Sequence, residues 1–201
     1  MVTQATTSED TRKRIMQTAF NEFYRCGFQG ASLNRIVAEA STTKGALFHH
    51  FRGKADLGLA VVDEILFPEV RSVWVDPLNQ SDDPIRTITD IMTRMAEECS
   101  GDRLCQGCPL NNLAQEMSPL DEEFRLRLEQ IYAAWRGAIE ASFTRGISAG
   151  NIDSAVNPKE IAAFMVACFA GTIGTAKNAQ DPNIMALSGA ALMKYMETLR
   201  P

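Results

Sequence analysis

The apolar residues recur with helical spacing through almost the whole chain, and this periodicity limits the possible folds more than any other feature. No segment alternates apolar and polar residues between hairpin turns, as a half-buried strand would. Proline tolerates the first helical position because its missing N–H is not needed there, so a capping residue followed by proline indicates a helix start. Four such pairs occur: Asp83-Pro84, Ser118-Pro119, Asn157-Pro158 and Asp181-Pro182. The sequence therefore predicts an all-α protein with about nine helices.

Three helices are expected near the N-terminus. The first covers about residues 8–26, and Gly27 is placed to stop it. Ser32 is placed to cap a short helix over 33–40, and a polar turn leads to a second short helix over about 43–51. Three helices of these lengths predict one small tri-helical unit.

Longer helices are expected behind this unit, and Gly150 is placed to end the longest of them. Their expected ranges are 54–74 (with a bend at Pro68), 84–99, 109–117 and 119–149, followed by one helix from Pro158 and one from Pro182. The one plausible module boundary lies near residues 52–56. The expected domains are therefore residues 1–55 and residues 56–201.

The charges are distributed unevenly along the chain, whose net charge is -5. Residues 1–56 carry eight Lys or Arg against five Asp or Glu, giving +3, and the remainder carries twelve against twenty, giving -8. A basic module on an acidic body is typical of a protein that binds nucleic acid. No signal peptide is recognised, and the longest uncharged stretch, 161–176, is shorter than the roughly 20 residues of a membrane span. We therefore expect a cytoplasmic protein with no membrane contact, whose five cysteines are reduced thiols.

The segment 32–57 carries the most specific signal. Its apolar residues at helical spacing, Leu47 and Phe51 among them, are expected to face the first helix. The second short helix then leaves one set of side chains outside: Thr43, Lys44, Gly45, Phe48 and His49. A short helix with small residues and flanking lysines can enter the major groove of DNA.

Segment 32–57 resembles the DNA-binding signature of TetR-type (TetR/AcrR) transcriptional regulators. The resemblance implies a helix-turn-helix domain over 1–55, an effector-binding and dimerisation domain over 56–201, and no enzymatic activity. It implies that a double-stranded DNA operator is contacted by Ser32, Thr43, Lys44, Gly45, Phe48, His49 and Lys54, with Ser32 and Lys54 on phosphates. Three positions depart from the usual pattern: Phe48 replaces Tyr, Ser41 replaces Gly and Ala46 replaces Thr. Core packing is the alternative for Phe48, and a solvated helix-start lysine is the alternative for Lys54.

The histidines and cysteines are the candidate metal or redox sites. His49 and His50 point about 100° apart on a helix, so they do not share a face that could bind a metal. Cys105 and Cys108 would need two more ligands for zinc, with Cys99 the nearest candidate, and a βαβ context for thioredoxin-like chemistry. We therefore expect no metal and no cofactor.

Cys108 precedes Pro109 and is expected at a helix N-terminus, where a thiolate is stabilised. The stretch 107–116 resembles a Gly-Cys motif at the start of the sixth helix in a subset of TetR-type regulators, some of which respond to oxidants or electrophiles. The resemblance implies a sensing role for Cys108, with Cys105 or Lys177 nearby. A small buried thiol that only packs is the alternative.

The helix from Pro158 to about Lys177 is apolar nearly all round and rich in small residues, so other helices must cover it. The last helix carries a candidate seam of Met185, Leu192, Met196 and Leu199. Together the two helices are expected to form half of a four-helix homodimer interface. The alternative is a purely intramolecular core.

An unknown small-molecule effector is expected to bind in the body and to lower operator affinity by linkage. The apolar candidates for its pocket are Trp74, Met92, Met95, Tyr132, Trp135 and Phe169, and the polar candidates are Cys108, Asn111, Asn112 and Gln115. Two other functions stay open: a thiol enzyme or zinc protein built on Cys105 and Cys108, and a degenerate protein-binding module.

Overall fold

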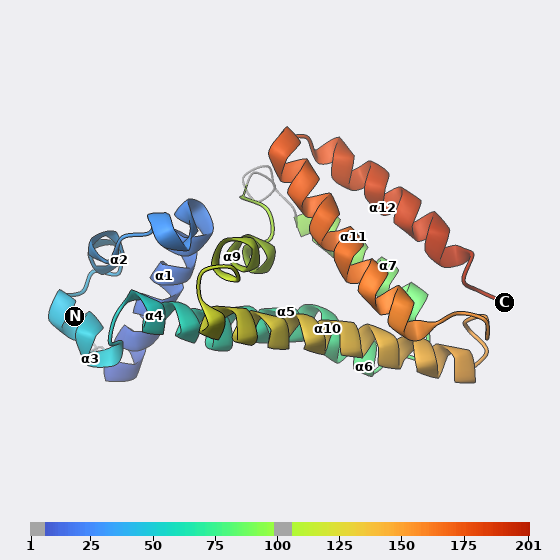
Figure 1. Cartoon of the computed structure of the whole chain (residues 1–201), viewed down its shortest axis with the longest axis horizontal. Coiled ribbons are helices and arrows are strands. Elements are labelled where there is room, and N and C mark those ends of the chain that lie inside the picture. Colours follow the sequence, from blue (N-terminus) through green and yellow to red (C-terminus); the bar gives the residue numbers. More distant parts are fainter. Residues whose placement is uncertain (1–6, 99–105) are drawn as a thin grey trace, which may run out of the picture. The chain divides into compact units, whose positions relative to one another are not determined.

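The structure, a computed structural model, describes residues 7–98 and 106–201, and within these ranges every regular element is helical (Figure 1). The predicted all-α class is thus confirmed. The elements are α1 (Ser8–Gly30), α2 (Leu33–Glu39), α3 (Lys44–His50), α4 (Lys54–Val61), η1 (Val62–Leu66), α5 (Phe67–Val70), η2 (Arg71–Val75), α6 (Asp76–Asn79), α7 (Pro84–Glu98), α9 (Pro109–Met117), α10 (Glu122–Ser148), α11 (Pro158–Ala179) and α12 (Pro182–Glu197).

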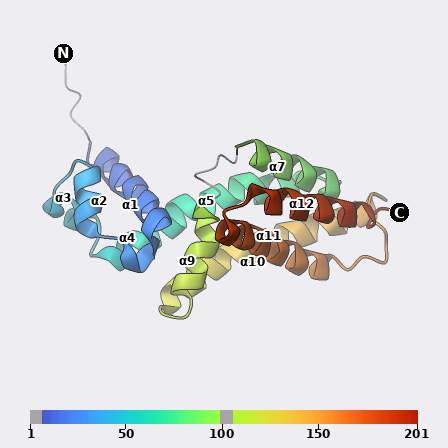
Figure 2. The same cartoon turned by 90° about the horizontal axis from the view of Figure 1, so that it is seen from above.

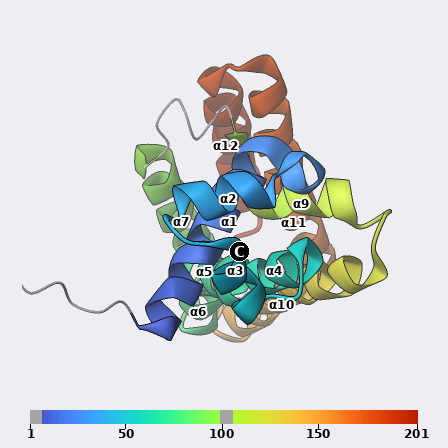
Figure 3. The same cartoon turned by 90° about the vertical axis from the view of Figure 1, so that its left-hand side faces the viewer.

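The chain forms two compact units. The first comprises Met1–Pro68 and Asn112–Leu128, and the second comprises Glu69–Asn111 and Glu129–Pro201. In the first unit, α2 and α3 pack on α1, and α4 packs along α1 (Figure 3). In the second unit, α12 packs against both α11 and α7 (Figure 2). The functional domains expected over 1–55 and 56–201 stay a prediction.

The α1 helix breaks at Gly27, where the sequence predicts a stop, but one more helical turn continues to Gly30. Gly27 has a φ of 75°, a left-handed value that other residues rarely adopt. The two amides after the break point away from the α1 ladder and donate to a carboxylate: Phe28 N and Gln29 N each lie 2.7 Å from an oxygen of Glu116. Glu116 therefore caps the last turn of α1 from the end of α9.

The helix expected over 54–74 is longer than predicted, because helical residues continue to Asn79. Two turns in it are π-helical, η1 and η2, and each is followed by a proline, Pro68 and Pro77. In both cases the residue before the proline donates its N–H five residues back, from Phe67 to Val62 and from Asp76 to Arg71. A proline inside a helix lacks an N–H and collides with the carbonyl four residues earlier. Each widened turn directly precedes a position where that conflict arises.

Three of the four predicted helix starts are confirmed by their caps. Asp83 accepts from Arg86 N at 3.1 Å, Asn157 from Lys159 N at 3.1 Å, and Asp181 from Asn183 N at 2.9 Å. Each cap satisfies an amide that the first helical turn leaves without a partner.

The predicted start at Ser118-Pro119 is wrong. Leu120 N and Asp121 N both donate to Met117 O at 3.0 Å, so Ser118 and Pro119 form the turn that closes α9. The α10 helix begins at Glu122 instead, where Asp121 Oδ1 accepts from Glu123 N at 2.9 Å and from Phe124 N at 3.1 Å. The Asp121 carboxylate, with no proline after it, is the N-cap that the sequence pattern missed.

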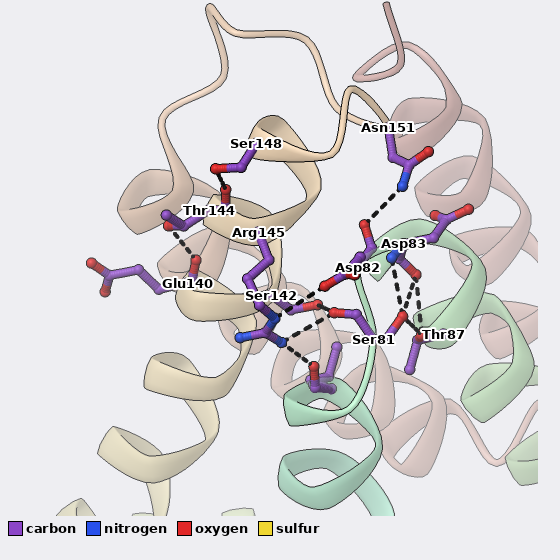
Figure 4. Close-up of polar contacts among 11 residues, drawn as sticks. Ser81, Asp82, Asp83, Thr87, Glu140, Ser142, Thr144, Arg145, Ser148 and Asn151 are labelled. Carbon is purple, nitrogen blue, oxygen red and sulfur yellow. Dashed lines mark hydrogen bonds and ion pairs between the residues drawn. The ribbon is translucent and has the colours of Figure 1, made fainter.

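In the second unit, Arg145 of α10 forms hydrogen bonds with the turn between α6 and α7 (Figure 4). Its guanidinium donates to Leu78 O at 2.6 Å and to Ser81 O at 3.1 Å, and Ser142 Oγ also donates to Ser81 O at 3.3 Å. Asn151, just beyond α10, donates to Asp82 O at 3.1 Å. These bonds satisfy the carbonyls of Ser81 and Asp82 in the turn and add a side-chain donor to Leu78 O, which also accepts from Ser81 N.

The predicted dimer seam on the last helix is largely wrong. Leu192, Met196 and Leu199 are buried inside the second unit, in one cluster with the aromatic residues of α10 and α11. Met185 is half-buried. The intramolecular alternative is therefore correct for these three side chains, since the exposed face of α12 is the opposite one.

The α11 helix is long and apolar enough, by length and composition alone, to cross a membrane, although 33% of its most apolar window is buried in the chain. Its inner face, with Ile161, Met165 and Phe169, is buried, while Phe164 on the outer face is 47% exposed. A helix also meets this criterion when one of its faces packs in a protein core and its other face associates with a partner.

We expect Gly27→Ala to lower the free energy of unfolding by about 1–3 kcal/mol. An alanine would keep the strained φ of 75°, and its Cβ would lie 3.0 Å from Glu116 Oε2. Urea denaturation followed by circular dichroism measures the change. The matched control is Gly30→Ala, whose Cβ has no neighbour closer than 3.8 Å, so its effect should stay within about 0.5 kcal/mol. Equal stabilities for the two variants would contradict the prediction.

Candidate DNA-binding surface and effector cavity

The α2 and α3 helices form a helix-turn-helix with the buried face predicted from the sequence. Ile36 is 0% exposed, Leu47 1% and Phe51 3%. The tight turn between the helices places Ser41 at a φ of 46°, which is why glycine is the more favourable residue there. The two helices of seven residues each are thus held by side chains that pack on α1.

The outward face of α3 also matches the prediction. Thr43, Lys44, Gly45 and His49 are exposed, and Phe48 is 53% exposed, so the core-packing alternative for Phe48 is wrong. Thr43 is the N-cap, and its Oγ accepts from Ala46 N at 3.1 Å. Because this bond uses only an acceptor position, the hydroxyl proton of Thr43 is still available to donate.

A cationic or hydrogen-bonding group lies at each end of this outward face, and no side chain blocks its middle. A Cβ on Gly45 would have only Thr43 Oγ1 as a neighbour, at 3.8 Å, so the surface is open there. Lys44 follows the N-cap directly, and His49 lies in the last turn. Positive charge and free N–H groups at a helix start attract phosphate, while the exposed helix face can approach base edges.

Ser32 and Lys54 are placed differently from Lys44 and His49. Ser32 is the N-cap of α2, but its side chain makes no capping bond, and its own N–H donates to Glu22 at 3.2 Å. The Lys54 ammonium donates to Gln29 O at 3.0 Å and lies 5.0 Å from the centre of the Phe28 ring. Burial lowers the pKa of Lys54. Phosphate contacts by Ser32 and Lys54 stay predictions, and Lys54 is not a free solvated lysine.

Glu22 supports this surface from inside the first unit, and the sequence reasoning missed it. Its side chain is 0% exposed, yet it accepts from Arg25 Nη2 at 2.5 Å and Arg35 Nε at 2.6 Å. Burial alone raises the pKa of Glu22, but the bonds from Arg25, Arg35 and the Ser32 amide outweigh it and hold the pKa below the ordinary value. The buried carboxylate thereby ties α2 to α1. Glu22 lies three residues after Ala19 and seven after Ile15, on the apolar face of the first helix, and this position was the available signal.

The second unit holds a cavity of about 820 Å³ between α7, α11 and α12. Of the predicted pocket residues, Met92, Met95 and Phe169 line this cavity. Trp74 and Trp135 do not line it, but they pack behind Phe169, with ring centroids 4.6 and 5.9 Å from its ring. Two methionines of α12 complete the lining on that side, Met185 and Met193.

The remaining pocket candidates do not gather at this cavity. Tyr132 is half-buried and its hydroxyl donates to Asn111 Oδ1 at 3.4 Å. Asn112 and Gln115 belong to the first unit, and Gln115 is exposed.

Cys108 lies directly before α9, as predicted, but its thiol is not an activated one. Burial raises the pKa of Cys108, and the amides of Leu110 and Asn111, which favour a thiolate, do not offset this effect. Lys177 lies in the last turn of α11. Cys99 and Cys105 lie outside the described residues. Among residues 7–98 and 106–201, no three His, Cys, Asp or Glu side chains are grouped to hold a metal ion.

We expect Glu22→Gln to lower the free energy of unfolding by about 1–3 kcal/mol at pH 7, because two guanidinium groups lose their charged acceptor. The folded pKa of Glu22 lies below the ordinary 4.5, so this contribution is fully present above about pH 4.5. It is lost as the pH falls through the folded pKa, so the two proteins should converge in acid. Urea denaturation at pH 7 and in a series down to pH 3 measures the difference. Glu39→Gln, which removes an exposed partner of Arg25, is the control and should have little effect at any pH.

Comparisons with known proteins agree with this architecture. Residues 15–61 match the bacterial regulatory proteins of the tetR family, and residues 84–192 match the tetracyclin repressor-like C-terminal domain. The transcriptional repressor DhaR of Mycobacterium sp. (strain GP1) is 26% identical over 81% of this chain and 80% of its own length. An uncharacterised HTH-type regulator of Lactococcus lactis is 28% identical over 62% of this chain, which spans 63% of that relative. A TetR transcriptional regulator from Chloroflexus aurantiacus superposes with a TM-score of 0.82 at 25% identity, covering 94% of this chain and 96% of that one. The chain therefore belongs to the TetR family of bacterial transcriptional regulators.

Proposed function

We propose that the protein is a homodimeric repressor that binds a pseudo-palindromic DNA operator through α3 and is released by a small-molecule effector. The observation that carries the proposal is the two-sided α3 helix, with Leu47 buried and Thr43, Lys44 and His49 exposed on the opposite face. DhaR, which is similar over most of its length, is described as a repressor.

Each exposed residue of α3 has a distinct role in this proposal. Thr43 donates its hydroxyl proton to a phosphate beside the helix N-terminus, and Lys44 adds positive charge there. His49 approaches base edges, and the bare surface at Gly45 lets the helix enter the groove. Phe48 has no hydroxyl to donate to a phosphate, so it contributes an apolar contact, for example with a thymine methyl group.

Dimerisation is supported by an exposed apolar face on α11 and α12. Phe164 is 47% exposed, Leu187 71% and Tyr195 40%, and the rings of Phe164 and Tyr195 meet edge to face with centroids 5.3 Å apart. Ala163 and Ala167 beside them are also exposed, and small residues let a partner helix approach closely. This face replaces the predicted seam of Leu192, Met196 and Leu199. Two copies joined here would present two recognition helices to one pseudo-palindrome.

The effector is proposed to occupy the cavity between α7, α11 and α12. Its volume of about 820 Å³ is within the range of small-molecule sites, and most of its lining is apolar. An effector that binds better to the arrangement unable to fit the operator lowers operator affinity by linkage.

Modification of Cys108 is a second route of release, favoured by the amides of Leu110 and Asn111 that point at its sulfur. Because burial raises the thiol pKa, we expect slow modification, accelerated at high pH. An electrophile such as N-ethylmaleimide should release the protein from its operator, and Cys108→Ser should abolish that response while Cys26→Ser, at an exposed cysteine, should not. Release of the Cys108→Ser protein at the wild-type rate would exclude this route.

The DNA-binding proposal is tested by selecting bound duplexes from a random pool at moderate salt, since phosphate contacts make affinity steeply salt-dependent. We expect enrichment of a pseudo-palindrome. The double variant Lys44→Ala/His49→Ala should bind the selected site at least thirty-fold more weakly, because each lost contact contributes about 1 kcal/mol or more. Fluorescence anisotropy with the selected duplex measures this change.

The control is Lys159→Ala, which removes an exposed lysine from the second unit and should leave operator affinity unchanged. Enrichment of a single half-site would contradict the dimeric proposal. A pool without enrichment at any salt would refute DNA recognition and favour a protein-binding module or a thiol-based activity.

A further inference from the structure

We propose that the cavity of the second unit binds bulky apolar cations, with Glu97 as the counter-charge and the methionines and Phe169 as the apolar walls. Only the effect of this binding on operator affinity rests on the proposed function. Binding itself can be measured on the protein without DNA.

The cavity lies at the edge of the core of the second unit, and its wall includes both core residues and exposed residues. Phe169 on α11 and Leu192 on α12 belong both to that core and to the cavity lining. In Figure 2, α7 lies beside α12, with α11 next to them. The cavity therefore adjoins the apolar core of the second unit, and its walls are formed without a ligand.

Four methionine side chains, Met92, Met95, Met185 and Met193, line the cavity, and each is half-buried. These side chains still expose apolar surface to water. Burial of that surface by a ligand is favourable. Methionine is unbranched and polarizable, so these walls can adapt to ligands of different shape. The methionines thus favour a large apolar ligand over a small polar metabolite.

The charge of the ligand follows from the charged groups in the lining. Among the described residues that line the cavity, Glu97 of α7 is the one ionisable side chain, and none of these described residues is a lysine, arginine or histidine that could receive an anion. The other polar residues of the lining are neutral: Thr93, Thr172, Gln180 and Ser188. A cation beside the carboxylate gains Coulomb energy that an anion loses. The Phe169 ring adds an aromatic surface to which cations are attracted.

The most exposed residue of the proposed dimer face on α12 lies away from the cavity. Gly189 lines the cavity, whereas Leu187, two residues earlier and about 200° away around the helix, is 71% exposed on the proposed dimer face. Ser188 of the cavity lining lies seven residues before Tyr195 and therefore on nearly the same side of α12, so the cavity borders the proposed dimer face. A cation bound there lies next to that face. It can act through the packing of α7, α11 and α12.

Two probes of matched size and opposite charge test the proposal: tetraphenylphosphonium and tetraphenylborate. The chain has two tryptophans, Trp74 and Trp135, and both pack against Phe169, so their fluorescence should respond when the cavity fills. We expect the full-length protein to bind the phosphonium saturably and at least ten-fold more tightly than the borate. Isothermal titration calorimetry gives both affinities independently of the optical signal.

Single substitutions test whether the probe binds in the cavity and whether Glu97 supplies the negative charge. Glu97→Gln should weaken phosphonium binding about three-fold to five-fold, as expected for a partly solvated ion pair, without weakening borate binding. Asp90→Asn is the matched control, because Asp90 is an exposed carboxylate two turns earlier on the same helix and does not line the cavity. Ala186→Phe, at an exposed position of the wall, should fill the cavity and reduce binding of both probes.

Several outcomes would overturn the inference: no saturable phosphonium binding, equal or tighter borate binding, equal losses in Glu97→Gln and Asp90→Asn, or unchanged binding in Ala186→Phe. None of these outcomes affects operator binding, which is measured separately on the selected duplex. If the protein binds its operator and the phosphonium test fails, only the cation site is refuted.

Discussion

The carboxylate of Glu116, bound to two amides of α1, is the interaction on which the organisation of the first unit depends. It satisfies Phe28 N and Gln29 N, the donors that the break at Gly27 exposes. Beside it, the Phe28 ring packs on Phe124 with centroids 4.9 Å apart, over Gly58, where any Cβ would lie within 2.7 Å of both rings. These contacts explain why residues 112–128, distant in sequence, form one compact unit with the helix-turn-helix.

Two acids, Glu22 and Glu116, thus hold the helices of the N-terminal segment, whose net charge over residues 1–56 is +3. Glu22 draws the guanidinium groups of Arg25 and Arg35 together at the start of α2, and Glu116 lies close enough to favour the charged form of Lys54. The basic residues of this segment therefore have two uses. Arg35 and Lys54 hold the first unit together, while Lys44 and His49 on α3 are exposed. A count of net charge by segment cannot distinguish these uses.

The sequence correctly predicted features that depend on neighbouring residues. The caps at Asp83, Asn157 and Asp181 and the two faces of α3 depend on residues within one or two turns, and the sequence placed them correctly. Features that depend on distant partners were missed or wrong. Glu116 lies 88 residues from Phe28, and the inner face of α12 packs on α7 and α11, so its apolar seam could not be separated from a dimer seam by periodicity alone. The thiolate expected at Cys108 is not favoured, because burial raises the pKa of Cys108 more than the amides of Leu110 and Asn111 lower it.

The brevity of α2 and α3 has a consequence for the order in which the protein folds. Each has seven residues, well below the roughly 12–15 at which an isolated helix persists in water. The recognition helix therefore cannot form ahead of α1 and its packing partners, and it should be among the first elements to unravel when that packing loosens. A nascent or partly unfolded chain would then be unable to occupy DNA, and limited proteolysis would cut first around the turn at Ser41.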